Sequence, residues 1–490
     1  MTTNHKKLKN GISYDLNGWK YISVKGKPRE RGYAHGFFVA EQFKKVQEML
    51  IFLCNHDFGY PWSFFIEAGV KLLKQTIKEH FAEFYEEMEG IVEGINAAKA
   101  GVTTDIDEIL AWNNYFLLTE SWFNNREDES GKKVIRHGEG GGASERCSAF
   151  IATGDWTADG KMIACHNNFS NFIDGSWACN VVDLNCEKGN RILYMGFVGW
   201  IFSGTDFWIS SAGIFGTETT IGGFLPFENK WPISCRLRKA MQYGNSLDDY
   251  VEMLVHNCSG DYSNTYLLCN INDNEIMSLE LGLKYHEVKR TKNGFFIGHN
   301  APYNAQIRNL ECSNTGSFNI ARHNCSRRVT LNKLMDKYKG KIDLEIAKLI
   351  LSDHFDPYLE KEDHPCSRTV CSHYSLSPRY YMAADPSRPA PYQARGAIDG
   401  NVISYDLAKN MSFELKYGSS CNIPFDADEY FKKHPQWNDY QPYIFSRPNQ
   451  PYTLFTITDN YKKSNYKTKH RLHSGNKTKK HPRKNQNTSK

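Results

Sequence analysis

Cys147 is the residue whose surroundings suit covalent chemistry. It directly follows residues 126–146, a polar, glycine-rich stretch with almost no apolar residue, and it opens the strand-like run Cys147-Ser-Ala-Phe-Ile. A thiol is a strong nucleophile. A cut just before Cys147 would also expose its own α-amine, whose pKa of about 7.7 to 8.0 suits a general base near neutral pH. One residue could then supply both nucleophile and base.

The segments on either side of Cys147 predict how the thiol is positioned. Residues 126–146 predict an exposed, cuttable loop, because they can bury little surface and their glycines keep the backbone loose. Residues 147–169 alternate like two strands joined around Ala158-Asp159-Gly160, an Asp-Gly hairpin signal. A hairpin that begins at a cysteine after such a loop is typical of an N-terminal-nucleophile hydrolase. The competing interpretation is a small cysteine buried as a hydrophobic residue.

Local signatures of other chemistries do not occur in the sequence. There is no Cys-x-x-Cys, no His-Glu-x-x-His, no Walker-type glycine loop and no Gly-x-Ser-x-Gly, so we expect no metal and no cofactor. Thirteen cysteines are an odd number, so at least one thiol is free. Cys366 and Cys371, close together in a polar loop, are the pair that best fits a disulfide.

The positive charge of the chain is concentrated at its C-terminal end. The formal net charge is +5, yet the last thirty residues carry eleven Lys or Arg and no acidic residue, which leaves 49 basic against 55 acidic residues in the rest. Such a tail cannot bury enough apolar surface to fold, so we expect residues 460–490 to be disordered. It serves either solubility or weak binding of an anionic partner, a nucleic acid or a membrane surface.

The elements that must carry Cys147 follow from the hydrophobic pattern. Residues 1–125 predict a mostly helical part, with a short β segment near residues 12–25 and helical spacing through Leu53 and again over residues 66–98. After the loop, strands and helices predict an α+β body. No run approaches the roughly 20 apolar residues that span a bilayer. The expected strands are residues 192–195, 207–211, 265–270, 276–280 and 295–298, the expected helices are residues 236–241, 247–254, 329–338 and 344–351, and residues 352–452 are expected to wrap the core as long loops.

Several separated motifs give the chain a family resemblance. They are Cys147-Ser-Ala, His166-Asn-Asn-Phe, the stretch 209–222, the stretch 256–264, and Asp356-Pro357 with the loop from Cys366 to Cys371. Over about residues 147–435 the chain resembles the phospholipase B-like family, a branch of the N-terminal-nucleophile hydrolases. It is more loosely similar to the acyltransferases that process penicillin precursors. Residues 31–36 give a weaker match.

The resemblance implies a fold and a division of the chain. The fold is a four-layer αββα sandwich, cut by the protein itself between Arg146 and Cys147 into two chains that stay associated. The resulting parts are a mostly helical part at residues 1–125, a flexible linker at 126–146, a catalytic core at 147–459 and the basic tail at 460–490.

The resemblance also implies roles for individual residues. Cys147 is the nucleophile, and Asn264 corresponds to the asparagine that holds the oxyanion, although Asp261 and Ser263 depart from the family's pattern around it. His166 either orients the amine or is a hydrogen-bonded core histidine. Near the substrate, the expected residues are Phe169, Glu218, Thr219 and Arg322. Glu218 and Thr219 could instead bond a neighbouring strand, and Arg327 and Arg328 compete with Arg322.

The function expected from this resemblance is release of fatty acyl groups from phospholipids. Two alternatives stay open: an N-acyl amide hydrolase or acyltransferase of the same clan, and a non-catalytic binding or packaging protein that uses its basic tail. The family suggests a lysosomal or secreted protein, and Asn-x-Ser/Thr triplets begin at Asn168, Asn257, Asn324 and Asn410. The N-terminus shows no secretory signal, so the compartment is left open.

Overall fold

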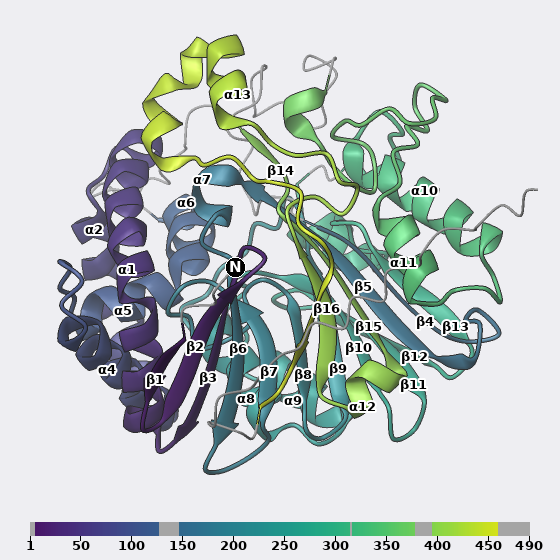
Figure 1. Cartoon of the computed structure of the whole chain (residues 1–490). Helices are drawn as coiled ribbons and strands as arrows, with labels where there is room; N and C mark the ends of the chain where they lie inside the picture. Colours follow the sequence, from purple (N-terminus) through teal and green to yellow (C-terminus); the bar gives the residue numbers. More distant parts are fainter. Residues whose placement is uncertain (1–4, 127–146, 314–315, 378–393, 459–490) are drawn as a thin grey trace, which may run out of the picture. The chain divides into compact units, whose positions relative to one another are not determined.

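Two β-sheets lie at the centre of the computed structural model (Figure 1). The structure describes residues 5–126, 147–313, 316–377 and 394–458. The chain divides into two units, residues 1–458 and 459–490, and the second is outside the described residues. The predicted flexible linker and basic tail therefore fall almost entirely outside the described ranges.

The larger sheet contains ten strands and is antiparallel except where β3 pairs with β6. In spatial order its strands are β1 (Lys6–Leu8), β2 (Gly11–Leu16), β3 (Trp19–Gly26), β6 (Asn180–Cys186), β7 (Ile192–Gly196), β8 (Phe207–Ser210), β9 (Ile214–Thr220), β10 (Asn264–Asn270), β11 (Glu275–Leu281) and β12 (His286–Thr291).

The smaller sheet has seven strands and carries Cys147 on its second strand. In order they are β13 (Gly294–Gly298), β4 (Cys147–Gly154), β5 (Gly160–Asn171), β15 (Asp399–Ser404), β16 (Ser412–Tyr417) and β17 (Thr453–Thr456), with β14 (Arg395–Ala397) paired to the end of β5. The predicted hairpin of residues 147–169 is therefore confirmed as β4 and β5.

Most helices lie before β4 or after β9, and the short α7 lies between β5 and β6. The α-helices are α1 (Pro28–Leu53), α2 (Trp62–Gly69), α3 (Gln75–His80), α4 (Ala82–Ala97), α5 (Ile106–Asn113), α6 (Phe123–Asn125), α7 (Phe172–Gly175), α8 (Ile233–Tyr243), α9 (Leu247–Val255), α10 (His323–Lys337), α11 (Leu344–Leu351), α12 (Tyr405–Lys409) and α13 (Ala427–Lys433). Short π-helical turns cover Cys54–Phe58, Val70–Lys74, Leu117–Trp122 and Ile307–Glu311, and 3-10 turns cover Tyr374–Leu376 and Pro435–Tyr443.

Apolar side chains fill three successive cores between these elements. The first joins one face of the ten-stranded sheet to helices that include α1, α4, α8 and α9. The second contains residues of both sheets, such as Phe215 of β9 and Ile151 of β4, and so lies between them. The third joins the far face of the smaller sheet to α10 and α11. Figure 1 shows α1 and α4 on one side of the strands and α10 and α11 on the other.

Close packing of α1 on α4 depends on four glycines. Gly32 and Gly36 of α1 face Gly90 and Gly94 of α4, and a Cβ atom added at Gly36 would lie 2.0 Å from the backbone oxygen of Ile91. Only glycine permits backbones to approach this closely. The stretch 31–36, which matched the family only weakly, therefore has a packing role here.

A buried ion-pair network lies beside this helix pair. Arg31 contacts Glu83 and Glu87 at 2.8 and 2.7 Å, and Arg238 of α8 contacts Glu87 at 2.7 Å. Because two arginines face it, the pKa of Glu87 is lowered to about 2 even though burial opposes its charge. The network joins α1, α4 and α8 over the ten-stranded sheet.

The mixed helix-and-sheet prediction is confirmed, with two corrections. The helical run of residues 66–98 is broken at Phe81, whose φ and ψ of −140° and 42° separate α3 from α4. Residues 352–452 do not simply wrap the core, since they contain β14, β15 and β16. β14 and β15 pair with the distant strand β5, as Asn401 does with His166, and such long-range pairing leaves no local pattern.

Among the described residues, no helix has the length and apolarity needed to cross a membrane. Of the four Asn-x-Ser/Thr triplets in the described ranges, Asn168 and Asn324 are buried, whereas Asn257 and Asn410 are exposed. Among these four, a glycan could be accommodated in the folded chain only at the two exposed positions.

Candidate active site

Cys147 is the first residue of β4 and is fully buried. It pairs with Asn168 of β5, and Ala149 and Ile151 on the same face of β4 pack between the sheets. Side chains alternate along a strand, so Cys147 also belongs to this inner face. The thiol at the start of β4 therefore points toward the ten-stranded sheet.

Both main-chain groups of Cys147 have side-chain partners. Its backbone nitrogen donates to Asn300 Oδ1 at 3.0 Å, and its carbonyl oxygen accepts from Arg327 Nη1. Arg327 also donates from Nη2 to Asn300 Oδ1 at 2.8 Å and from Nη1 to the hydroxyl of Ser148 at 3.2 Å. Asn300 is fixed in turn by a 2.7 Å hydrogen bond from Nδ2 to the carbonyl oxygen of Thr220.

The thiol of Cys147 faces a carboxylate and an imidazole. Its Sγ donates to Asp206 Oδ2 over 3.8 Å, and the hydroxyl of Tyr262 donates to the same oxygen at 3.1 Å. One atom each from Cys147, His166 and Asp206 lies within 4.8 Å of the others. The predicted pair Cys147 and His166 is therefore brought together, and Asp206 is added to it.

Three of the residues around Cys147 have left-handed backbone conformations. Asp206, Tyr262 and Asn300 have φ values of 70°, 48° and 65°. Such conformations are uncommon for residues other than glycine and tend to gather at functional sites. The surrounding structure must hold these three residues in their unfavourable conformations, as it does at many functional sites.

Burial keeps the thiol of Cys147 protonated. The pKa of Cys147 is raised well above its ordinary value, chiefly by burial and then by the negative charge of Asp206. Burial also lowers the pKa of His166 to about 3, so its imidazole is neutral near pH 7. The thiol and the imidazole are therefore both uncharged near pH 7.

Asp399 is a second buried acid close to the start of β4. Its Oδ1 accepts from the backbone nitrogen of Asn168 at 3.2 Å and from Asn401 Nδ2 at 2.8 Å. Burial raises the pKa of Asp399 to about 8, against the effect of these hydrogen bonds. The group therefore carries a proton at neutral pH, next to the residue that pairs with Cys147.

Asn264 lies at the start of β10 in the larger sheet. As the first residue of β10 it pairs with Thr220, the residue whose carbonyl oxygen binds Asn300. Its Nδ2 donates to the hydroxyl of Tyr266 at 3.3 Å. The structure thus connects Asn264 to Cys147 through Thr220 and Asn300, and its amide hydrogen bonds along its own strand.

The three predicted substrate residues on β5 and β9 are all buried. Glu218 pairs with Tyr266 of β10, and Thr219 fills the space where Gly298 lacks a side chain. Phe169 packs with Cys371 and Ala397, and the guanidinium of Arg327 lies 5.3 Å from the centre of its ring. Phe169 thus supports Arg327 from the outer side of the smaller sheet.

Among the competing arginines, Arg327 is the one that contacts Cys147. Arg322 caps the start of α10, where its backbone nitrogen donates to the carbonyl oxygen of Asn319 at 2.8 Å. Arg328 is oriented toward Phe318, whose ring centre lies 5.5 Å from its guanidinium. Arg327 lies in α10, five residues after Arg322, and its guanidinium reaches the carbonyl oxygen of Cys147.

The predicted disulfide between Cys366 and Cys371 is wrong, because both are free thiols in the structure. The Sγ of Cys366 lies 3.6 Å from Asp356 Oδ2, whereas that of Cys371 lies 3.4 Å from His373 Nε2. The two side chains have different partners. Proximity in sequence did not imply that their sulfurs point toward each other.

The stretch 256–264 owes its departures from the family's pattern to a structural role. Asp261 contacts Arg236 at 2.8 Å, and its other oxygen accepts from the backbone nitrogen of Ile233 at 2.6 Å at the start of α8. Asp261 therefore anchors a helix. Tyr262, directly after it, is the neighbour that reaches Asp206.

Four residues at the site were missed by sequence reasoning: Asp206, Tyr262, Asn300 and Asp399. Asp206 follows Gly204 and Asn300 follows Gly298, both at the ends of short apolar runs where polar residues are turn signals. These signals predict turns without saying which turns meet. Only the pairing of the strands brings them to Cys147.

Comparison with known proteins gave weak matches. No family model matches the sequence, and no curated protein matches it. Among solved structures, the chain is similar to penicillin V acylase from Agrobacterium tumefaciens, at 10% identity and a TM-score of 0.30, over 55% of this chain and 83% of that one. It is similar to a variant of conjugated bile acid hydrolase from Clostridium perfringens, at 10% identity and a TM-score of 0.28, over 56% and 82%. At such TM-scores the likeness carries no argument.

Proposed function

We propose that the chain is an acyl hydrolase whose nucleophile is the thiol of Cys147, released as a new N-terminus by self-cleavage after Arg146. The supporting observation is the arrangement around Cys147: Asn300 binds its nitrogen, Arg327 binds its carbonyl oxygen, and its sulfur faces Asp206. A cysteine that only fills a core needs none of these partners.

The proposed self-cleavage moves one acyl group from nitrogen to sulfur and then to water. The sulfur of Cys147 attacks the carbonyl carbon of Arg146, and its proton passes by way of Asp206 to the leaving nitrogen. The resulting thioester is hydrolysed, which leaves a carboxylate on Arg146 and a free thiol and amine on Cys147. Asp206 Oδ2, at 3.8 Å from Sγ, is the nearest proton acceptor that supports this step.

In the cut protein the α-amine of Cys147 takes the role of base. An amine with a pKa near ~7.7 to 8.0 can accept the thiol proton at neutral pH. Asn300 Oδ1 already accepts from this nitrogen at 3.0 Å, so it would hold the amine in place after the cut. The thiolate then attacks an acyl carbonyl, the leaving group takes the proton, and water releases the acid from the thioester.

Asn264 is the proposed donor to the oxyanion. Its hydrogen bond to Tyr266 is long at 3.3 Å and costs little to exchange for a bond to a negatively charged oxygen. Loss of one such donor typically slows catalysis by about 10² to 10³. We expect Asn264→Ala to lose activity on this scale, whereas Tyr266→Phe, which removes only the present acceptor, keeps most of it.

The fold that we propose for this core has four layers, αββα. It is supported by the three apolar cores, which lie between helices and the larger sheet, between the two sheets, and between the smaller sheet and α10 and α11. In such a sandwich the first residue of a central strand opens toward the space between the sheets.

For the substrate, we propose a fatty acyl group on a phospholipid, with N-acyl amides as the competing class. The family resemblance favours the ester, and a thiol of this kind is chemically able to cleave either bond. A panel of diacyl phospholipids and matched N-acyl amides decides between them. Release of fatty acid from the amides alone would exclude the phospholipase assignment.

Comparison of the purified chain with Cys147→Ala by intact-mass measurement tests the proposal. We expect two fragments from the natural chain, with the second beginning at Cys147, and one full-length species from the variant. Cys165→Ala is the matched control, since Cys165 is buried on the neighbouring strand and faces the opposite side. If the natural chain also remains a single inactive species, the non-catalytic binding protein is the better assignment.

A further inference from the structure

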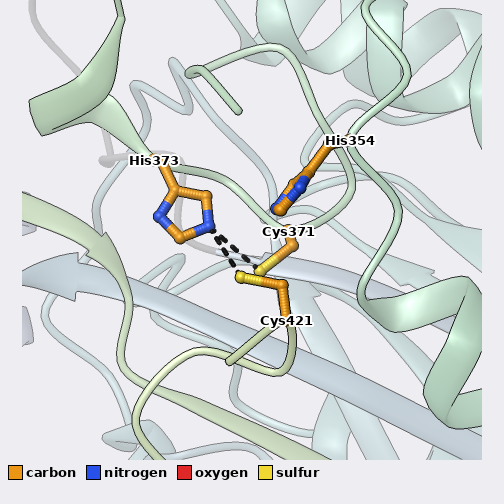
Figure 2. A group of neighbouring side chains, drawn as sticks. All are labelled: His354, Cys371, His373 and Cys421. Carbon is orange, nitrogen blue, oxygen red and sulfur yellow. Dashed lines mark hydrogen bonds between the residues drawn. The ribbon is translucent and has the colours of Figure 1, made fainter. Parts of the chain in front are cut away.

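Four side chains, three from residues 354–373 and one from Cys421, converge on one point outside the candidate active site (Figure 2). They are His354, Cys371, His373 and Cys421, which we call the His/Cys cluster. One sulfur or ring nitrogen from each lies within 4.8 Å of the corresponding atoms of the other three. Cys371 and His373 are buried, whereas His354 and Cys421 are partly buried.

The distances within the His/Cys cluster are close to those around a tetrahedral zinc ion. His373 Nε2 lies 3.4 Å from the Sγ of Cys371 and 3.2 Å from that of Cys421. Bonds of ~2.3 Å from zinc to sulfur and ~2.0 to 2.1 Å to nitrogen place two such ligands about 3.6 Å apart at a tetrahedral angle. For these two pairs, movements of a few tenths of an ångström suffice to reach the distances of a zinc site.

His354 is oriented as a zinc ligand would be. Its Nδ1 lies 3.3 Å from Asp363 Oδ1, and its buried Nε2 makes no hydrogen bond of ordinary geometry among the described residues, while the side chain interacts with Cys421 of the cluster. A carboxylate on one ring nitrogen fixes the proton there and leaves the lone pair of the other for a metal. In Figure 2 the ring of His354 points toward the sulfurs of Cys371 and Cys421.

We propose that the His/Cys cluster binds one Zn²⁺ ion as a structural site. Two thiolates and two imidazoles in a tetrahedral arrangement are a preferred ligand set for zinc. All four positions are filled by protein atoms, so no position is open for a water or a substrate. On binding, the two thiols release their protons to solvent, and the two thiolates balance the charge of the ion.

The ion would fasten C-terminal segments to the strand that carries His166. Cys371 packs on Phe169 of β5, and Cys421 contacts the same group from a loop after β16. Beside them, Asn167 donates to the carbonyl oxygens of Leu351 and Val370 at 2.8 and 3.1 Å. Zinc would thus join the loops around 354–373 and 418–421 to each other where they pack against Phe169 of β5, outside the smaller sheet.

Metal content of the purified full chain, prepared without a metal-binding tag, tests the proposal by elemental mass spectrometry. We expect about one zinc per chain, and the same value in Cys147→Ala, because the site is independent of the proposed catalysis. Cys421→Ser and His373→Ala should lose the zinc. Cys312→Ser, which changes a half-buried free thiol outside the cluster, should keep it.

Thermal unfolding supplies a second measurement that does not depend on the variants folding. A strong chelator should lower the unfolding midpoint of the natural chain, and added Zn²⁺ should restore it. The proposal is overturned if the natural chain carries no zinc after preparation with equimolar Zn²⁺. It is also overturned if Cys421→Ser retains zinc, or if intact mass shows Cys371 and Cys421 joined as a disulfide, lighter by two hydrogens.

Discussion

The side-chain oxygen of Asn300 accepts a hydrogen bond from the backbone nitrogen of Cys147 at 3.0 Å. The same oxygen accepts from Arg327 Nη2 at 2.8 Å, and Asn300 Nδ2 donates to the carbonyl oxygen of Thr220. One amide therefore ties the first residue of β4 to the last residue of β9. Since β4 and β9 belong to different sheets, Asn300 fixes the backbone nitrogen of Cys147 relative to both.

Asn300→Ala should slow self-cleavage by on the order of tenfold to a hundredfold, because it removes hydrogen bonds that contribute about 1–3 kcal/mol, one of them to a charged group. Asn300→Asp keeps the acceptor for Cys147 and Arg327 and a residue that tolerates a positive φ, but it loses the Nδ2 donor to Thr220, so it should be impaired less than Asn300→Ala. Fragment formation over time, followed by intact mass, measures both. Equal rates for the two variants would show that Asn300 does not position Cys147.

Arg327→Lys should impair the site more than Arg322→Lys does. The guanidinium of Arg327 reaches Cys147, Ser148 and Asn300 together, and a lysine ammonium cannot reproduce that fork. We expect at least a tenfold loss of acyl hydrolysis for Arg327→Lys and less than a threefold change for Arg322→Lys, if a good hydrogen bond is worth about 1.5 kcal/mol or more. If the initial rate of acyl hydrolysis falls more for Arg322→Lys than for Arg327→Lys, Arg322 is the arginine that supports the site.

In Asp206→Asn, the rise of the self-cleavage rate with pH should occur at lower pH than in the natural chain. The negative charge of Asp206 is the second-largest cause of the raised pKa of Cys147, after burial, so its removal makes the thiol easier to ionise. The maximal rate should fall as well, because the nearest proton acceptor is lost. Tyr262→Phe, which removes only the hydroxyl on the same oxygen, is the control. A profile that shifts upward in Asp206→Asn would contradict this electrostatic role.

The buried carboxyl group of Asp399 should make the free energy of unfolding depend on pH. Its pKa rises from an ordinary value of 3.8 to about 8 on folding, so the folded chain binds this proton more tightly than the unfolded chain does. Its contribution to stability is therefore fully present below pH 3.8 and is lost as the pH rises through about 8. Asp399→Asn keeps the shape of the protonated acid, and denaturant unfolding should show a smaller decline for it over this range. Parallel curves for the two proteins would mean that the acid is ionised when folded.

Sequence patterns predicted elements well and the site only in part. The spacing around Cys147 indicated the hairpin. The helix expected over residues 247–254 is α9, which begins at Leu247 after Ser246, whose hydroxyl accepts from the backbone nitrogen of Asp249 at 3.1 Å. These features depend on neighbouring residues, so local patterns reveal them.

The partners of Cys147 depend on strand pairing over long distances. Asp206 and Asn300 lie in turns at the ends of different strands, and no local pattern states that the two turns meet beside β4. The His/Cys cluster has the same property, because its ligands do not follow a short zinc motif. The sequence-based expectation of no metal relied on such motifs and could not address this arrangement.

The glycine contact between α1 and α4 allows the helical layer to be tested separately from the chemistry. Gly36→Ala places a Cβ atom 2.0 Å from the backbone oxygen of Ile91, and backbone cannot move aside as a side chain can. We expect a loss of about 3 kcal/mol or more in unfolding free energy, at or above the upper end of the usual cost of overpacking. Gly69→Ala in α2 is the matched control, because its added Cβ would lie at an ordinary 3.4 Å from Ala111, so the change should be within about 1 kcal/mol. Denaturant unfolding in the Cys147→Ala background avoids interference from cleavage, and similar midpoints for the two glycine variants would show that the helices pack less closely than described.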